Sequence, residues 1–130
     1  MIFIDSSFFV ALVDMKDQWH QKAKVLIPII ADENILISDL IIVESVSIIG
    51  KRSGGKAGEQ LYNYFMDNCQ IVHLDEKTLK GGFLEFLKYD GTLSISDAVS
   101  VFIMKKKRIE RIISFDSDFD KVDGIMRIYD

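Results

Sequence analysis

Five short apolar runs, rich in β-branched residues and separated by longer segments of helical pattern, constrain the fold of this chain most strongly. The runs predict strands at Ile2–Ile4, Ile35–Ile37, Ile71–Leu74, Ile112–Ser114 and Met126–Tyr129. Between them, periodic segments predict helices over Ser7–Val13, Gln18–Ile30, Asp39–Gly50, Gly55–Cys69, Glu76–Tyr89 and Ser96–Lys107. This alternation is typical of an α/β fold with a mainly parallel sheet.

The chain has the size and composition of one domain, spanning residues 1–130. Hydrophobic residues make up 48% of it, and no glycine- or serine-rich tract indicates a linker. The net charge of −4 has the wrong sign for binding nucleic acid through overall charge. A polyanionic partner would therefore have to bind through a local feature of the surface. Because the most hydrophobic tract, Leu40–Gly50, is too short to cross a bilayer, we expect a cytoplasmic protein that binds no membrane.

Acidic residues follow two of the predicted strands where the strands end. Asp5 comes directly after Ile2–Ile4, and Asp116 comes shortly after Ile112–Ser114. In an open parallel sheet, ligands bind outside the carboxyl ends of the strands, because loops and helix N-termini converge there. We therefore expect both carboxylates at that edge of the sheet.

Each of these acids, and others nearby, also has a purely structural explanation. Asp5 is as well suited to cap the next helix as to bind a metal, and Ser6 is either a cap or a hydroxyl group that orients a carboxylate. Asp97 lies in the first turn of a predicted helix, where the helix dipole alone favours an acid. Asp116 and Asp118 could form a turn through Asx-type hydrogen bonds.

Glu44 projects from the apolar stripe of a helix whose opposite face is apolar as well. A buried unpaired carboxylate is costly, so we expect it to take a proton, pair with a cation or bind a metal. The other interpretation is a surface acid that reaches solvent. Because a helix that is apolar all round must be covered on both sides, the segment Leu40–Ile49 predicts a homodimer.

If Asp5, Glu44, Asp97 and Asp116 converge, their charges repel one another unless a cation lies among them. Oxygen ligands without Cys or His select Mg²⁺ or Mn²⁺ over zinc. Without these four acids the chain has 16 acidic and 16 basic residues, so the excess acid would be local. Such a centre suits phosphodiester hydrolysis, in which a metal polarises the phosphoryl oxygen and activates a water molecule.

Two basic clusters follow the third and sixth predicted helices. The first contains Lys51, Arg52 and Lys56, and the second begins at Lys105 and ends at Arg108. Lys51, Arg52, Lys56 and Lys105 are candidates for binding the backbone of a nucleic-acid substrate. Alternatively, both clusters are solvated helix ends whose cations complement the helix dipole.

Three segments, MIFIDSSFFVALVD, DLIIVESVSIIG and LSISDAVSVFIMKKKRIERIISFDSDFDKVDGI, together resemble the PIN domain and, within it, the VapC-type toxins of prokaryotic toxin–antitoxin pairs. The resemblance covers nearly the whole chain. It implies a three-layer α/β/α sandwich with a mainly parallel five-stranded sheet. It also implies a Mg²⁺-dependent endoribonuclease that cleaves RNA, forms a homodimer and is held inactive by a small antitoxin protein.

The resemblance also assigns roles, position by position. The family's four acids fall on Asp5, Glu44, Asp97 and Asp116, and the metal ligands among them are Asp5, Asp97 and Asp116. Ser6 and Ser114 match positions where the family usually has a small hydroxyl residue that supports the acids. Asp118 matches an acid that is found in only part of the family.

Two other functions are compatible with parts of the sequence. A carboxylate after the first strand also occurs in phosphotransfer domains and phosphatases, but the phosphatases usually place D-x-D there, whereas Asp5 is followed by two serines. A non-catalytic PIN-like module that binds RNA or protein is the stronger alternative, since a protein can keep its fold after losing its catalytic activity. The intact acids argue against it.

Overall fold

A computed structural model describes residues 1–130 and confirms the alternation of strands and helices. The five strands are β1 (Ile2–Ile4), β2 (Ile35–Ser38), β3 (Cys69–Val72), β4 (Arg111–Ile113) and β5 (Met126–Ile128). The six α-helices are α1 (Ser6–Val13), α2 (His20–Ala31), α3 (Asp39–Ser53), α4 (Gly55–Asn68), α5 (Glu76–Lys88) and α6 (Ile95–Lys107), and a 3₁₀-helix, η1, spans Ser117–Lys121.

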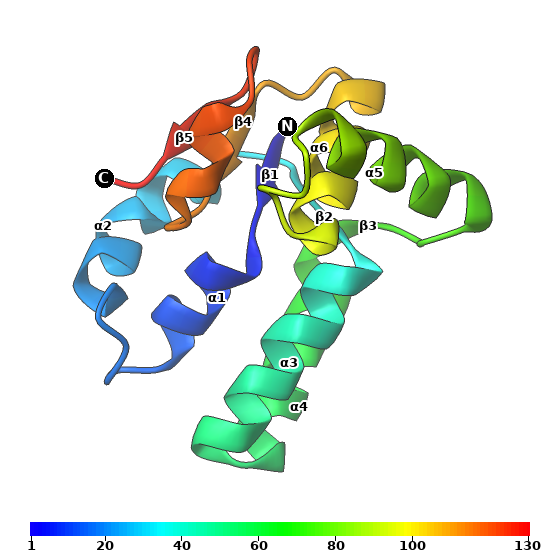
Figure 1. Ribbon diagram of the computed structural model, residues 1–130. Helices are drawn as coiled ribbons and strands as arrows, with labels where there is room; N and C mark the ends of the chain where they lie inside the picture. The colour runs from blue at the N-terminus through cyan, green and yellow to red at the C-terminus, as the bar shows by residue number, and fades with distance from the viewer.

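The strands form one parallel sheet in the order β3-β2-β1-β4-β5. The chain builds the sheet outward from β1 through β2 to β3, and then returns to the other side of β1 with β4 and β5 (Figure 1). Every residue of β1 and β2 is buried, so helices cover both faces of the sheet centre. The predicted parallel five-stranded α/β fold is therefore confirmed.

Two helix pairs flank the sheet. Helices α3 and α4 lie side by side and extend away from it, while α5 packs along α6 (Figure 1). The second pair is very close, because a Cβ added to Gly82 of α5 would lie 2.3 Å from Cγ2 of Val99 on α6. Only glycine allows this approach of α5 to α6.

Most boundaries lie within two residues of the predicted ones, and two of the differences have a clear physical cause. Cys69 starts β3 instead of ending a helix, because its backbone pairs with Ile35 of β2. Helix α3 continues to Ser53, three residues beyond the predicted end, and stops at Gly54, whose φ of 94° suits glycine. No helix combines the length and the apolar character needed to cross a lipid bilayer.

Candidate functional site

The order in which the chain adds strands reverses between β1 and β4, because β2 and β3 lie on one side of β1 and β4 and β5 on the other. The acids lie at this point of the sheet. Asp5 follows β1 directly, and its backbone N–H donates to the carbonyl group of Ile113, the last residue of β4, at 3.0 Å. Asp116 lies three residues beyond that strand end. Ligand sites of open parallel sheets lie at such switch points, where the connections on either side diverge.

One cleft of about 370 Å³ opens at this edge. Its wall carries six carboxylates and one basic side chain, that of Arg52. The cleft brings together all four predicted acids. The six acidic residues are Asp5, Asp17, Glu44, Asp97, Asp116 and Asp118. A larger hollow of about 650 Å³ lies at the opposite edge of the sheet and has a single acid, Glu110, in its wall.

Asp5 is the most deeply buried acid, with 6% of its surface exposed. The hydroxyl groups of Ser7 and Ser114 each donate to its Oδ2 atom at 2.8 Å. Burial raises the pKa of Asp5, and the two hydroxyl groups act against that rise because they stabilise the carboxylate. Asp5 does not cap α1 with its side chain, so the capping explanation is not what the structure shows.

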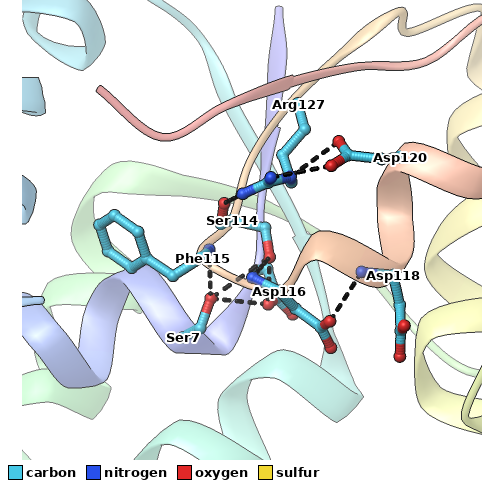
Figure 2. A network of polar contacts seen from close by, with 8 residues as sticks. Ser7, Ser114, Phe115, Asp116, Asp118, Asp120 and Arg127 are labelled. Atoms are coloured by element: carbon cyan, nitrogen blue, oxygen red, sulfur yellow. Dashed lines mark hydrogen bonds and ion pairs between the residues drawn. The ribbon is translucent and has the colours of Figure 1, made fainter.

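Ser7 and Ser114 also fix the backbone after β4. The Oγ atom of Ser7 accepts the N–H of Phe115, and the Oγ atom of Ser114 accepts the N–H of Asp116, both at 3.0 Å (Figure 2). Each serine thus joins the first acid to the segment that carries the fourth. Ser7 was not among the residues predicted for the site. Its position two residues after Asp5, as the second of two consecutive serines, was the feature that could have indicated this role.

Asp97 lies in the first turn of α6, which begins after Ser94. The Oγ atom of Ser94 accepts the N–H of Asp97 at 3.1 Å, so Ser94 caps the helix. Burial, and then the charges of Asp5 and Asp116, raise the pKa of the Asp97 carboxyl group to about 7. An acid that only stabilised the helix dipole would have its pKa lowered, so this shift indicates a crowded acidic site.

Asp116 and Asp118 form the predicted Asx-type turn. Oδ1 of Asp116 accepts the N–H of Asp118 at 2.9 Å, at the start of η1 (Figure 2). One carboxylate oxygen from each of Asp97, Asp116 and Asp118 lies within 4.8 Å of the other two. Lys121 pairs with Asp118 at 3.0 Å from one turn further along.

Glu44 was expected to be buried, and this expectation is wrong. Its side chain is exposed, and the hydroxyl group of Ser6 donates to its Oε1 atom at 2.8 Å. Helix α3 buries only one side, marked by Ile41 and Ser45, whereas Val43 is 63% exposed. The position of Glu44 at the wall of the cleft keeps it in solvent while it still contributes to the acidic site.

The acidic site fits a hard divalent cation. Its donor atoms are carboxylate oxygens, without a Cys or His side chain among them, which is the set that Mg²⁺ and Mn²⁺ prefer. Burial first, and then the charges of neighbouring acids, raise the pKa values of Asp5 and Asp97, so a cation bound among these carboxylates would stabilise their ionised forms. The closest trio is Asp97, Asp116 and Asp118, whereas the resemblance implied Asp5, Asp97 and Asp116 as the metal ligands.

The predicted substrate-binding cations are spread over the molecule. Only Arg52 lines the cleft, where its Nη1 atom pairs with both Asp14 and Asp17 at 3.0 Å. Lys105 instead pairs with Glu85 at 3.0 Å, at the far end of α6 from the acids. The other two, Lys51 and Lys56, are exposed and do not line the cleft.

Residues 2–125 match the model of the PIN domain family. Among solved structures, the chain is similar to VapC20 of Mycobacterium tuberculosis, a sarcin–ricin loop cleaving toxin, with a TM-score of 0.83 and 24% identity over 93% of this chain and 94% of that one. It is also similar to a toxin–antitoxin complex from Klebsiella pneumoniae (TM-score 0.73, 16% identity, 97% and 96% covered). A third similar structure is VapBC2 from Rickettsia felis, bound to a promoter DNA fragment (TM-score 0.72, 11% identity, 98% of each chain). No curated protein compared with the chain matches it significantly in sequence.

Proposed function

Since this chain belongs to the PIN domain family, we propose that it is a divalent-metal-dependent endoribonuclease and the toxin component of a toxin–antitoxin pair. The observation that carries the proposal is the acidic cleft at the switch point of the sheet, with six acids in its wall. Folds of this type host many functions, so the proposed activity depends on the residues of the cleft more than on the fold.

The acids divide into those that would hold the cation and those that would handle protons. Asp97, Asp116 and Asp118 present the closest oxygen atoms, and Asp5 adds a carboxylate that two hydroxyl groups hold in one orientation. When bound, Mg²⁺ or Mn²⁺ would polarise a phosphoryl oxygen and lower the pKa of a water molecule. Glu44 is exposed and oriented by Ser6, so it suits the transfer of a proton from the attacking water to solvent.

Arg52 is our candidate for contact with the RNA backbone. It is the only cation in a wall that otherwise carries negative charge, and guanidinium groups bind phosphate through paired N–H donors. Its hydrogen bonds to Asp14 and Asp17 both use Nη1, so the donors on Nε and Nη2 are available to a phosphate group. The other predicted cations would contribute at most to long-range attraction.

The proposed partner is a small antitoxin protein, and the proposed assembly is a homodimer. Support for the antitoxin comes from similar structures, one of which is a toxin–antitoxin complex. The dimer is expected from the apolar helix α3, where Val43 is 63% exposed. Light scattering at micromolar concentration tests the dimer. Co-purification with the product of the adjacent reading frame tests the antitoxin.

Cleavage of RNA by the purified protein tests the catalytic proposal. We expect cutting that requires added Mg²⁺ or Mn²⁺, stops with a chelator and is lost in Asp5→Asn and Asp97→Asn. Because water and not a ribose 2′-hydroxyl attacks, the products should carry no 2′,3′-cyclic phosphate, which a contaminating metal-independent ribonuclease would leave. Equal cleavage by wild type and both variants would contradict the proposal. If the chain binds RNA without cutting it in either metal, the non-catalytic module is correct instead.

A further inference from the structure

An aromatic column runs from the core to the wall of the cleft. The ring of Phe8 is fully buried and lies against Phe115, with ring centroids 6.5 Å apart and planes at 28°. Phe115 lies in turn against the indole of Trp19, with centroids 5.4 Å apart and planes at 9°. Trp19 is half-buried and lines the cleft, so it ends the column where the acids begin.

The surrounding contacts hold Trp19 in place. Its backbone N–H donates to Oδ1 of Asp17 at 2.9 Å, and Oδ2 of the same carboxylate pairs with Arg52 at 3.0 Å. Phe115, against which the indole packs, is itself fixed by Ser7 beside Asp5. The indole, the guanidinium group and the acids are therefore parts of one connected network around a single cleft.

We propose that Trp19 forms a nucleobase subsite, in which the base next to the scissile phosphate stacks on the indole and displaces Nζ of Lys22, which lies over the ring 5.5 Å from its centroid. This inference rests on the proposed ribonuclease function. Indole rings bind unstacked bases in a sequence-tolerant way, because every base has a π-face. The free donors of Arg52 lie in the same wall and would bind the phosphate attached to that nucleotide.

The subsite also defines the class of substrate. A base inside a duplex is already stacked on both sides, so it is not available to Trp19. The cleft volume of about 370 Å³ is near the lower end of the range of small-molecule pockets, about 300–1,000 Å³. This volume has room for one extruded nucleotide. A base that stacks on Trp19 is therefore an unpaired one.

Trp19 is the only tryptophan of the chain, so its fluorescence reports on this one subsite. The measurement uses Asp97→Asn protein in Mg²⁺ buffer, where RNA is not consumed, and binding is followed independently by polarisation of a labelled oligonucleotide. We expect saturable quenching by single-stranded RNA and none by the same sequence in a duplex. Binding of single-stranded RNA without quenching, or no binding at all, would overturn the inference.

Cleavage kinetics give a second readout. Trp19→Leu should lower kcat/KM on single-stranded RNA by on the order of ten- to a hundredfold, whereas Trp19→Phe, which keeps a ring, should stay within about threefold. Tyr62→Leu is the matched control, because Tyr62 is an aromatic side chain exposed on α4 outside the cleft. Thermal unfolding of each variant checks that the fold is kept.

An abasic nucleotide separates stacking from a structural effect of the substitution. Wild type should lose activity on RNA that lacks the base beside the cut, and Trp19→Leu should show no further loss on that RNA. Additive losses would mean that Trp19 acts on the fold and not on the base. If the wild type cleaves no RNA while quenching persists, the hydrolase proposal fails and the subsite stands. If it cleaves and Trp19→Leu cleaves equally well, only the subsite fails.

Discussion

The hydroxyl group of Ser114 donates a hydrogen bond of 2.8 Å to Oδ2 of Asp5, although the two residues are 109 positions apart in the chain. The same oxygen of Ser114 accepts the N–H of Asp116 at 3.0 Å. The carbonyl group of Ser114 accepts a further hydrogen bond from Arg127, which is paired with Asp120 (Figure 2). One serine thus couples the most deeply buried acid of the cleft to the loop that carries two others.

Ser114→Ala should shift the pH dependence of cleavage. The Ser114 hydroxyl group stabilises the ionised form of Asp5, so its removal raises the pKa of Asp5 further and moves the acidic limb of the kcat/KM profile to higher pH. We expect activity at neutral pH to fall by roughly tenfold. Ser100→Ala is the control, because this buried serine donates to a backbone carbonyl group of α6 and not to an acid. A profile that falls in height without moving would contradict the role given to Ser114.

The acidic site should make the metal-free protein less stable as pH rises. The pKa of Asp97 is about 7 in the folded chain against an ordinary value of 3.8, so between these values the folded state holds a proton that the unfolded state has released. The free energy of unfolding therefore decreases from about pH 4 to about pH 7 and the loss is complete above that. In a chelator, Asp97→Asn should be at least as stable as wild type at about pH 8, with a flatter dependence on pH.

Two controls accompany the Asp97 measurement. Asp120→Asn removes a carboxylate whose pKa is lowered by Arg127, so this variant should be destabilised near neutral pH, the opposite sign. Added Mg²⁺ should raise the Tm of wild type, because a ligand that binds only the folded state stabilises it, and should raise that of Asp97→Asn less. A large drop in Tm of metal-free Asp97→Asn would show that Asp97 supports the fold.

Arg52 and Lys105 should differ in their effect on cleavage. Arg52 lines the acidic cleft, whereas Lys105 pairs with Glu85 away from it. Arg52→Ala should lower kcat/KM roughly tenfold, mainly through KM, and Arg52→Lys should recover only part of the loss because it lacks the forked donors. Lys105→Ala should stay within about twofold. Equal losses in the two alanine variants would point to a general electrostatic effect.

The packing of α5 on α6 should be sensitive at Gly82. A Cβ there would lie 2.3 Å from Cγ2 and 3.0 Å from Cα of Val99, so Gly82→Ala forces the helices apart and should lower the free energy of unfolding by about 1–3 kcal/mol. Gly55→Ala adds the same methyl group where no atom lies within 4 Å, so it should be neutral or stabilising by up to about 1 kcal/mol. Urea denaturation measures both. Similar stability of the two variants would contradict the close approach.

Most of the fold could be predicted because it depends on local patterns. Runs such as Ile2–Ile4 and Ile35–Ile37 are apolar on both faces, which a central parallel strand requires, and the segments between them have helical periodicity. The boundary at Cys69 could not be predicted, because pairing with a strand 34 positions earlier decides it. Local propensity gave no indication of that partner.

The candidate site was predictable in its residues but not in its geometry. The acids at the ends of β1 and β4 follow from strand positions and from the switch-point rule. The exposure of Glu44 was missed, because an apolar helix does not reveal which of its sides the neighbouring helices cover. The bond from Ser7 to Asp5 spans only two residues, whereas the bond from Phe115 to Ser7 joins residues 108 positions apart and could not be predicted.

By itself, the amino-acid order determined which segments become strands and helices, and that acids follow the strands, since both depend on neighbours along the chain. Tertiary structure alone decided which carboxylates crowd together, which hydroxyl groups hold them, and that Arg52 and Trp19 share their cleft while Lys105 does not. Those relationships come from the return of the chain to the free side of β1, which brings residues about a hundred positions apart within a few ångströms.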